Sequence, residues 1–412
     1  MSIVRDKSLA GAGLAKINWV RDFMPVLGAL EKKMAAEQPL KGVKVAVCVH
    51  LEAKTAYLGM ALRSLGAELT LTASNPLSTK DDVCAALDSL GLQVFAWHGA
   101  TEHEYREHQI KALEFCPHVI IDDGGDLVNL LHDEVSEYAK NILGGCEETT
   151  TGLHRLRARS NAGKLNFPMF AVNDAKCKYL FDNIHGTGQS VWDGIMYTTN
   201  NMISGRTVVV AGYGHCGSGI AMRAKGLGAN VIITEVDRFR ALAALMDGFR
   251  VMPMAEAAKT GDIFVTATGC SKVITEEHFK VMKNNALLAN AGHFDVEVDV
   301  KALEKMCVKK EKRKPFIEGY HLSGGRILNL LAEGRLVNIV AGNGHPAEIM
   351  DLSFAIQLLS VLHVAKNAKG LKPLVYDIPK EIDDEVSRIK LAAMGIEIDA
   401  LTAEQLAYLG TM

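Results

Sequence analysis

Short apolar runs alternate along the chain with longer segments whose apolar residues recur at helical spacing. The runs predict buried strands, and the longer segments predict helices. In the first half the predicted strands are 43–49, 69–72, 94–97, 119–121 and 170–172, and the predicted helices are 16–34, 52–65, 81–90 and 104–113. Strands that alternate with helices are typical of an α/β protein with a doubly wound parallel sheet.

The second half repeats this alternation. Its predicted strands are 208–211, 231–234, 263–269, 286–294 and 327–331, and its predicted helices are 218–227 and 347–368. The last segment, 380–412, is charged and amphipathic but too small to form a domain. We therefore expect an α/β fold with two doubly wound units and a small C-terminal arm that packs on a partner subunit.

The best-defined motif is a G-x-G-x-x-G pattern at residues 212–217, between a predicted strand and a predicted helix. Gly212 permits a tight turn, Gly214 lets the backbone approach a pyrophosphate, and Gly217 lets helix and strand pack closely. The helix N-terminus adds free N–H groups for the phosphates. Glu235 ends the next strand, where a carboxylate binds ribose hydroxyls and repels a 2′-phosphate. This unit is therefore predicted to be Rossmann-like and to bind NAD rather than NADP.

Polar residues follow several predicted strands, and ligands of such sheets lie beyond the carboxyl ends of the strands. In the first half these ends carry His50, Ser74, Asn75, His98 and residues 122–126. In the second half they carry Thr268, Gly269 and His293. The first half thus has a polar crevice without a dinucleotide fingerprint, which indicates a substrate-binding unit. The strand ends of the second half are expected to face the cofactor.

Two further stretches concentrate chemically active side chains. Residues 145–152 crowd glutamates and threonines together, although the same residue types recur in capping boxes at helix N-termini. Lys178 and Asp182 are four residues apart, so on a helix they would share one face. A surface ion pair is the alternative interpretation of that spacing.

Composition narrows the classes of function. The formal net charge of −3 gives no electrostatic reason to expect nucleic acid, and the basic run 309–315 is expected to be a solvated surface loop. No uninterrupted apolar stretch is long enough for a membrane span, and the N-terminus lacks a secretory apolar region. Eight cysteines without a C-x-x-C pair indicate reduced thiols in a cytoplasmic protein and no metal site.

Six motifs together resemble the S-adenosyl-L-homocysteine hydrolase family, and the resemblance extends over nearly the whole chain. They are DDGGDL at 122–127, EETTTG at 147–152, NDAKCKYLFDN at 173–183, VAGYG at 210–214, NAGHFD at 290–295 and LAEGRLVN at 331–338. The C-terminus resembles the short-tailed branch, which includes S-inosyl-L-homocysteine hydrolases.

The resemblance implies a cytoplasmic homotetramer, or dimer of dimers, of the methyl cycle in one-carbon metabolism, with tightly held NAD and a small-molecule substrate. It implies a substrate-binding domain of residues 1–183 and 346–379, an NAD-binding domain of residues 184–345 and an oligomerisation arm of residues 380–412. The implied reaction is reversible thioether hydrolysis. NAD oxidises the ribose 3′-hydroxyl, the ketone acidifies the C4′ proton, homocysteine leaves from C5′, water adds, and the ketone is reduced again.

Motif position also implies roles for individual residues. Lys178 and Asp182 act at the 3′-hydroxyl, and Lys178 assists its deprotonation, for which burial under a closed lid would lower its pKa. Asp123 acts at C4′ and at the leaving group, while His50 and His293 handle protons at the 5′ oxygen and sulfur. The remaining implied catalytic residue is Asn183. The implied substrate-binding residues are His50, Glu52, Lys54, Thr55, Asp123, Glu148, Lys178, Asp182, Asn343, His345, Met350 and Phe354. The implied cofactor-binding residues are Thr149, Thr150, Thr151, Asn183, Gly212, Gly214, His215, Cys216, Gly217, Glu235, Thr268, Gly269, Gly292, His293, Asn338 and His345.

The chain departs from the commonly described adenosyl enzymes in three places. Thr187 stands where many members have a cysteine beside the nicotinamide. Residues 408–412 end the chain without the lysine- and tyrosine-bearing tail of many members. In the base pocket, the pattern His-x-Thr-x-Glu is replaced by His50-Leu51-Glu52-Ala53-Lys54.

The altered base pocket favours a different nucleobase. Lys54 has only hydrogen-bond donors, and Glu52 supplies an acceptor. Hypoxanthine offers O6 as acceptor and N1–H as donor, whereas adenine offers the reverse pattern, so S-inosyl-L-homocysteine is predicted to be accepted or preferred. In the alternative, an ordinary S-adenosyl-L-homocysteine hydrolase, Glu52 and Lys54 pair with each other or contact adenine through water. A net NAD-dependent oxidoreductase and a non-catalytic nucleotide-binding regulator are more remote alternatives.

Overall fold

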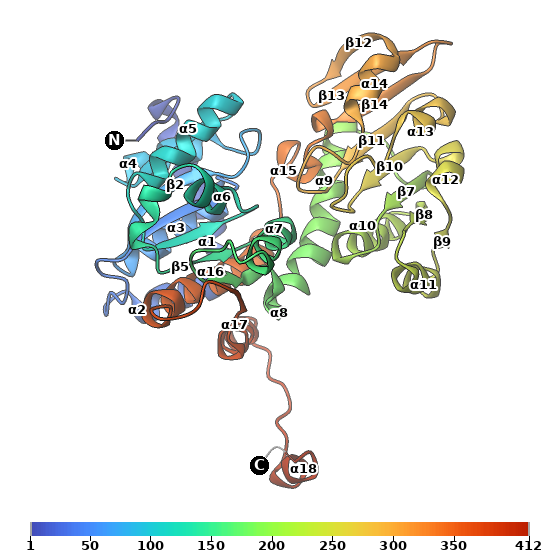
Figure 1. Cartoon of the computed structure of the whole chain (residues 1–412). Helices are drawn as coiled ribbons and strands as arrows, with labels where there is room; N and C mark the ends of the chain where they lie inside the picture. Colours follow the sequence, from blue (N-terminus) through green and yellow to red (C-terminus); the bar gives the residue numbers. More distant parts are fainter. Residues whose placement is uncertain (1, 411–412) are drawn as a thin grey trace.

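The computed structural model describes residues 2–410 and contains two open β-sheets, each covered by helices (Figure 1). The first sheet has the order β15-β6-β5-β4-β1-β2-β3, and all its neighbouring strands are parallel. Its strands are β1 (Lys44–Val49), β2 (Glu68–Ala73), β3 (Gln93–Phe95), β4 (Val119–Asp122), β5 (Gly144–Glu147), β6 (Met169–Ala171) and β15 (Val375–Asp377). The predicted α/β fold with doubly wound sheets is confirmed.

The strands of the first sheet are apolar because both faces of the sheet are covered. In β1, Val45, Val47 and Val49 belong to one core, whereas Ala46 and Cys48 belong to the core on the opposite face. The surrounding helices are α1 (Ala10–Asp22), α2 (Pro25–Met34), α3 (Ala53–Ser64), α4 (Asp81–Ser89), α5 (Glu102–Leu113), α6 (Asp126–Asp133), α7 (Thr150–Asn161), α16 (Ala347–Asn367) and α17 (Lys380–Ala393). The single helix predicted over 16–34 is wrong, because Pro25 starts a second helix after a break at residues 23–24.

The second sheet has the order β12-β13-β14-β11-β10-β7-β8-β9. Its strands are β7 (Thr207–Ala211), β8 (Asn230–Thr234), β9 (Arg250–Val251), β10 (Ile263–Thr266), β11 (Ala286–Asn290), β12 (Cys307–Lys314), β13 (Ile317–Leu322) and β14 (Ile327–Leu331). Its helices are α9 (Thr187–Thr199), α10 (His215–Gly226), α11 (Arg238–Met246), α12 (Met254–Thr260), α13 (Glu276–Val281), α14 (Val300–Met306) and α15 (Val337–Val340).

The basic run 309–315 is not the surface loop that its charge predicts. Most of it belongs to β12, an edge strand that pairs with β13 in antiparallel orientation. Its lysines are largely exposed to solvent. A charged edge strand of this kind is protected from pairing with other chains, so the charge has a structural reason.

Strand order reverses once within the parallel part of each sheet, and these reversals fix the position of the site. In the first sheet β1 lies between β2 and β4, so the loops after β1 and β4 leave in opposite directions. In the second sheet β7 lies between β8 and β10 in the same way. Such switch points create the crevices in which open α/β sheets bind ligands.

Two connections join the sheets. The outgoing chain passes through α8 (Lys176–Tyr179) and a π-helical turn (Asp182–Gly186) into α9, and it returns through α15 and α16. By length and composition α16 is the one helix among residues 2–410 that could span a membrane, but 67% of its apolar window is buried in the protein. Its apolar character is therefore explained by its place in the core.

The segment expected to form an arm, 380–412, has two parts that are placed differently in the structure. Its first part, α17, packs on its own chain, where Asp383 accepts hydrogen bonds from the backbone N–H groups of Lys176 and Cys177 at 2.7 and 2.8 Å. Its last helix, α18 (Ala403–Tyr408), lies away from the body at the end of an extended segment (Figure 1). Residues 411–412 lie outside the described residues.

Candidate active site

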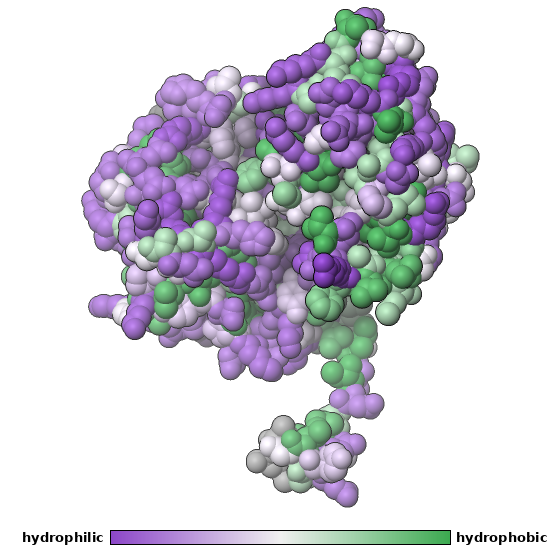
Figure 2. All heavy atoms as spheres, turned by 45° about the vertical axis from the view of Figure 1, so that its right-hand side comes forward, coloured by the Kyte–Doolittle hydropathy of each residue, from purple (hydrophilic) through white to green (hydrophobic). Residues whose placement is uncertain are grey.

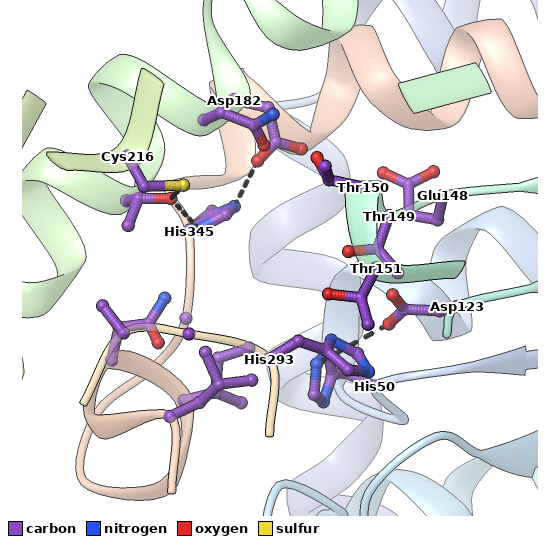
Figure 3. Close-up of a pocket in the computed structure, with 18 of the residues that line it drawn as sticks. His50, Asp123, Glu148, Thr149, Thr150, Thr151, Asp182, Cys216, His293 and His345 are labelled. Atoms are coloured by element: carbon purple, nitrogen blue, oxygen red, sulfur yellow. Dashed lines mark hydrogen bonds and ion pairs between the residues drawn. The ribbon is translucent and has the colours of Figure 1, made fainter. Parts of the chain in front are cut away.

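A cleft between the two sheets collects most of the predicted site residues (Figure 3). Its cavity volume is about 290 Å³, near the lower end of the range of pockets that bind small molecules. The predicted residues that line it are His50, Glu52, Lys54, Thr55, Asp123, Glu148, Thr149, Thr150, Thr151, Lys178, Asp182, Asn183, Gly214, His215, Cys216, Thr268, Gly269, Gly292, His293, Asn338, His345, Met350 and Phe354. Four predicted residues do not line it: Gly212, Gly217, Glu235 and Asn343.

His50 and Asp123 meet at the switch point of the first sheet. His50 Nε2 lies 3.6 Å from Asp123 Oδ2, and the Ser74 hydroxyl donates to the same oxygen at 3.1 Å. Burial lowers the pKa of His50 to about 4, although the Asp123 carboxylate opposes this, so the imidazole is neutral at pH 7.

His293 approaches this pair from the second sheet. The ring centroids of His50 and His293 are 6.2 Å apart. Gly124 permits this approach, because a Cβ there would lie 2.8 Å from His293 Nε2 and its φ of +118° is unfavourable for other residues. The three groups implied to move protons at the 5′ position are therefore brought together.

Lys178 and Asp182 form a buried pair that joins a short helix to a π-helical turn. The two residues do not lie on one regular helix, because α8 ends at Tyr179 and Asp182 begins the π-helical turn. Lys178 Nζ nevertheless lies 3.9 Å from Asp182 Oδ2. Lys178 also donates to Asn183 Oδ1 at 2.9 Å and to Asn173 Oδ1 at 3.1 Å. The side chains are only 6% and 3% exposed, which rules out a surface ion pair.

Each partner of the buried pair stabilises the charged form of the other. Burial alone would lower the pKa of Lys178, but the carboxylates of Asp182 and Glu148 raise it above its usual value. Burial alone would raise the pKa of Asp182, but Lys178, His345 and the Ser353 hydroxyl hold it below its usual range. In this structure the pKa of Lys178 is therefore raised, and Lys178 is a cation.

His345 connects this pair to the cofactor side of the cleft. Its Nδ1 lies 2.6 Å from Asp182 Oδ1, and its Nε2 lies 3.1 Å from Thr187 Oγ1 (Figure 3). The Cys216 thiol donates to Thr187 Oγ1 at 3.7 Å. A thiol therefore lies beside Thr187, although the position itself carries a hydroxyl.

Glu147 ends β5 and Glu148 follows it, and both are buried, so they do not form the capping box that their spacing also allowed. Thr149 precedes α7 without a side-chain cap bond. Glu148 Oε2 accepts from Gln357 Nε2 at 2.6 Å, while Glu148 Oε1 has no partner among residues 2–410. Burial raises the pKa of Glu148 to about 8, against the opposing charge of Lys178. This free oxygen is available to a ligand hydroxyl.

Glu147 holds together the two loops that carry Asp123 and Glu148. Its Oε1 accepts from the backbone N–H groups of Gly124 and Thr149, at 2.9 and 3.0 Å. Burial raises the pKa of Glu147 well above its usual range, with a smaller contribution from Asp122. Gly152 leaves the necessary space, because a Cβ there would lie 2.2 Å from the Glu147 carboxyl.

We expect Glu147→Leu to lower both kcat and the melting temperature, because two buried N–H groups lose their acceptor at about 1–3 kcal/mol each. Glu147→Gln keeps an acceptor oxygen and matches a neutral carboxyl in shape, so it should retain most activity. Thermal melts and steady-state kinetics on the three proteins check this. If Glu147→Gln lowered kcat and the melting temperature as much as Glu147→Leu does, an ionised carboxylate would be required instead.

The turn after β7 has the shape that a dinucleotide pyrophosphate requires. Gly217 cannot carry a side chain, because a Cβ would lie 2.0 Å from the Gly212 carbonyl oxygen. Gly214 caps α10 without a side-chain hydrogen bond, so the first N–H groups of the helix remain available for phosphate. Glu235 accepts from the Tyr213 N–H at 2.7 Å, which places its carboxylate beside the turn. These residues fit NAD.

The residues predicted to form the base pocket include a direct Glu52–Lys54 pair, which is one of the two arrangements of the alternative interpretation. Lys54 Nζ lies 2.8 Å from Glu52 Oε2 and donates to the Asn343 carbonyl oxygen at 2.9 Å. The pair forms because Glu52 precedes α3 with φ −136° and ψ −174°, outside the helix geometry that would separate the two side chains. Asn343 thus contributes its backbone, not its side chain, to this contact.

Several residues of the cleft were not assigned from the sequence. Thr187, His154 and Arg240 line it, and Ser74, Ser78 and Asn173 contact assigned side chains. Ser74 follows a predicted strand, and Asn173 belongs to the motif at 173–183. These two features of the sequence could have identified them as site residues. Ser78 and Arg240 stand in no motif, so only the folded chain identifies them. Among residues 2–410 no cluster of three His, Cys, Asp or Glu side chains could hold a metal ion.

Comparison with known proteins agrees with this geometry. Residues 2–140 match the family model of S-adenosyl-L-homocysteine hydrolase, and residues 183–344 match that of its NAD binding domain. Adenosylhomocysteinase of Pyrococcus abyssi is 54% identical over 406 residues, which cover 98% of this chain and 96% of that protein. S-inosyl-L-homocysteine hydrolase of Methanopyrus kandleri is 52% identical over 407 residues, with the same coverage of 98% and 96%. S-inosyl-L-homocysteine hydrolase of Methanocaldococcus jannaschii is 52% identical over 406 residues, which cover 98% of both chains.

Enzymes with both names are thus similar to the chain to nearly the same degree, and overall identity does not separate their substrates. The matches cover the two sheets and the cleft between them. The chain belongs to the S-adenosyl-L-homocysteine hydrolase family, and its second sheet carries the NAD-binding domain of that family.

Proposed function

We propose that the protein hydrolyses the thioether bond of an S-nucleosyl-L-homocysteine to a nucleoside and L-homocysteine, reversibly and with bound NAD. The observation that carries this proposal is the buried Lys178–Asp182 pair, which lines the same cleft as the dinucleotide turn and the His50–Asp123 pair. Incubation with the thioether should release a free thiol without accumulation of NADH. Accumulating NADH would favour a net oxidoreductase instead.

On the 3′ side of the substrate, charge stabilisation is the main task of the protein. NAD bound on the α10 turn supplies a reversible hydride acceptor for the 3′ carbon. Lys178 is a cation, so it favours the loss of the 3′-hydroxyl proton by stabilising the negative charge that develops on oxygen. Asp182 is ionised and supplies an acceptor, and the amide of Asn183 holds the lysine in place.

On the 5′ side, proton transfer is the main task. Asp123 is assigned to the proton at C4′, and His50 and His293 to the protons of the departing sulfur and the incoming water. Glu148, with its free buried oxygen, is assigned to a ribose hydroxyl. Met350 and Phe354 of α16 line the cleft as apolar surfaces for the base.

We infer that hypoxanthine is recognised at least as well as adenine. Lys54 donates two of its three N–H groups, one to Glu52 and one to the Asn343 carbonyl oxygen, so a third donor remains free. The Glu52 carboxylate beside it can still accept a hydrogen bond. Pairing of the two side chains therefore leaves a donor next to an acceptor, which suits O6 and N1–H of hypoxanthine. Adenine presents its amine to the lysine and a lone pair to the carboxylate.

We expect kcat/KM for S-inosyl-L-homocysteine to equal or exceed that for S-adenosyl-L-homocysteine, by up to roughly a hundredfold, since an unpaired buried polar group costs about 1–3 kcal/mol. Lys54→Met should remove this preference, whereas Lys54→Arg, which keeps donors and charge, should retain part of it. Parallel assays of both thioethers on one preparation measure the ratio. A tenfold advantage of the adenosyl compound in the wild-type enzyme would contradict the inference.

We further infer a homo-oligomer, such as a homotetramer, in the cytoplasm. All eight cysteines are free thiols, which suits a reducing compartment. Apolar side chains gather on the C-terminal segment that lies away from the body (Figure 2). Exposed apolar residues of this kind mark contact surfaces. On residues 394–410 and on α11 they are Met394, Ile396, Ile398, Leu401, Tyr408, Leu409, Phe239, Leu242, Leu245 and Met246.

A further inference from the structure

The loop between β2 and α4 places a buried hydroxyl against His50. Ser78 is fully buried, and its Oγ lies 2.7 Å from His50 Nδ1. The same hydroxyl donates to the Asn75 carbonyl oxygen at 3.0 Å. Since a serine hydroxyl has one proton, and that proton is used on Asn75, the Ser78 oxygen is an acceptor towards the imidazole.

On the opposite side of the imidazole ring, the acceptor recorded near Nε2 among residues 2–410 is a carboxylate oxygen of Asp123. His50 Nε2 is 3.6 Å from Asp123 Oδ2, which is longer than a hydrogen bond. A proton on Nε2 would therefore remain unpaired in a largely buried site, whereas a proton on Nδ1 has Ser78 at 2.7 Å. The hydrogen bond made by one ring nitrogen decides which nitrogen carries the proton.

We propose that Ser78 is a positioning residue that fixes the neutral imidazole of His50 with its proton on Nδ1, so that Nε2 presents a lone pair to the cleft. In this arrangement His50 begins the reaction as a proton acceptor and not as a donor. The role rests on the proposed thioether hydrolysis, but the protonated nitrogen is a property of the free enzyme.

The chemical consequence concerns the water that adds to the unsaturated intermediate. As its oxygen bonds to C5′, one water proton passes to His50 Nε2 and the electron pair of the double bond moves onto the ring ketone. The resulting imidazolium keeps its Nδ1 hydrogen bond to Ser78 and faces the Asp123 carboxylate. In the reverse direction the imidazolium returns this proton to the hydroxyl group that leaves C5′ as water, before homocysteine adds to the unsaturated intermediate.

The same loop supplies a matched control. Thr79 is buried beside Ser78 and also donates to the Asn75 carbonyl oxygen at 3.0 Å, but no contact joins its hydroxyl to His50. Thr79→Val therefore removes an equivalent hydrogen bond from the loop and leaves the acceptor for His50 in place. Any effect of loop damage alone would appear in this variant as well.

Two-bond ¹H–¹⁵N correlation spectra of the holoenzyme with labelled histidine test the proposal at neutral pH, with His50→Gln used to assign the signal. We expect the Nδ1–H pattern for His50 in the wild type and in Thr79→Val, and a shift towards Nε2–H in Ser78→Ala. We also expect kcat of Ser78→Ala to fall about tenfold or more, with KM and NAD content changed less than about twofold.

An Nε2–H pattern in the wild-type spectrum would overturn the proposal, whether or not the Ser78 variant folds. An unchanged tautomer in Ser78→Ala, or an equal loss of kcat in Thr79→Val, would overturn it too. An enzyme with the Nδ1–H pattern that hydrolyses neither thioether would instead contradict the proposed function and leave the tautomer assignment intact.

Discussion

Replacement of Lys178 by methionine is expected to reduce turnover by about a thousandfold or more. Methionine keeps an unbranched apolar stem but removes the cation beside Asp182, Asn173 and Asn183. The loss combines charge stabilisation of the 3′ oxygen with proton transfer, each worth about a hundredfold to a thousandfold or more. Single-turnover and steady-state assays of thiol release measure the effect.

Lys176→Met is the control for this experiment. Lys176 begins the same short helix two residues earlier, and its side chain is exposed. Its removal should leave kcat within about twofold of the wild type. Both variants should retain the circular dichroism spectrum and the NAD content of the wild type. Near-normal hydrolysis by the Lys178 variant would remove this residue from the proposed chemistry.

Gly217→Ala is expected to abolish retention of NAD. A Cβ at residue 217 would lie 2.0 Å from the Gly212 carbonyl oxygen, and backbone on both sides prevents relief by side-chain movement. The first turn of α10 must then move away from β7, and its N–H groups lose their alignment towards the phosphates. Nucleotide released by denaturation and identified by mass spectrometry measures retention.

Gly226→Ala is the matched control, since it lies on the same helix and a Cβ added there would meet nothing within 4 Å. It should retain NAD and gain slightly in stability, because alanine is the better helix former by about 1 kcal/mol. NADP among the released nucleotides of the wild type would contradict the role assigned to Glu235. Full NAD content in Gly217→Ala would contradict the close packing of α10 on β7.

Some strands could not be predicted because their sequences carry no strand signal of their own. β5 contains two glycines and a glutamate in four residues, and it is a strand because β4 and β6 pair with it on both sides. β12 is highly charged and is paired by β13. In both cases tertiary pairing outweighs local propensity.

The sequence by itself determined the alternation of strands and helices, the dinucleotide turn and the polar strand ends, and the family resemblance indicated most of the other assigned residues of the cleft. These features are local, because apolar periodicity, glycine geometry and the ends of parallel strands depend on residues close together in the chain. The same locality explains why β1, β7 and α16 lie close to their predicted bounds.

Only the tertiary structure decided which charges and protons these residues carry. The pKa of Lys178 is raised by the charges of Asp182 and Glu148, which belong to other elements of the fold. Glu147 can be buried because Gly152, which has no side chain, leaves room for its carboxyl group. Lys54 reaches Asn343 across 289 residues of sequence, and Ser78 faces His50 from the neighbouring strand end. Desolvation and hydrogen-bond partners set a protonation state, and both arise only when distant segments pack together.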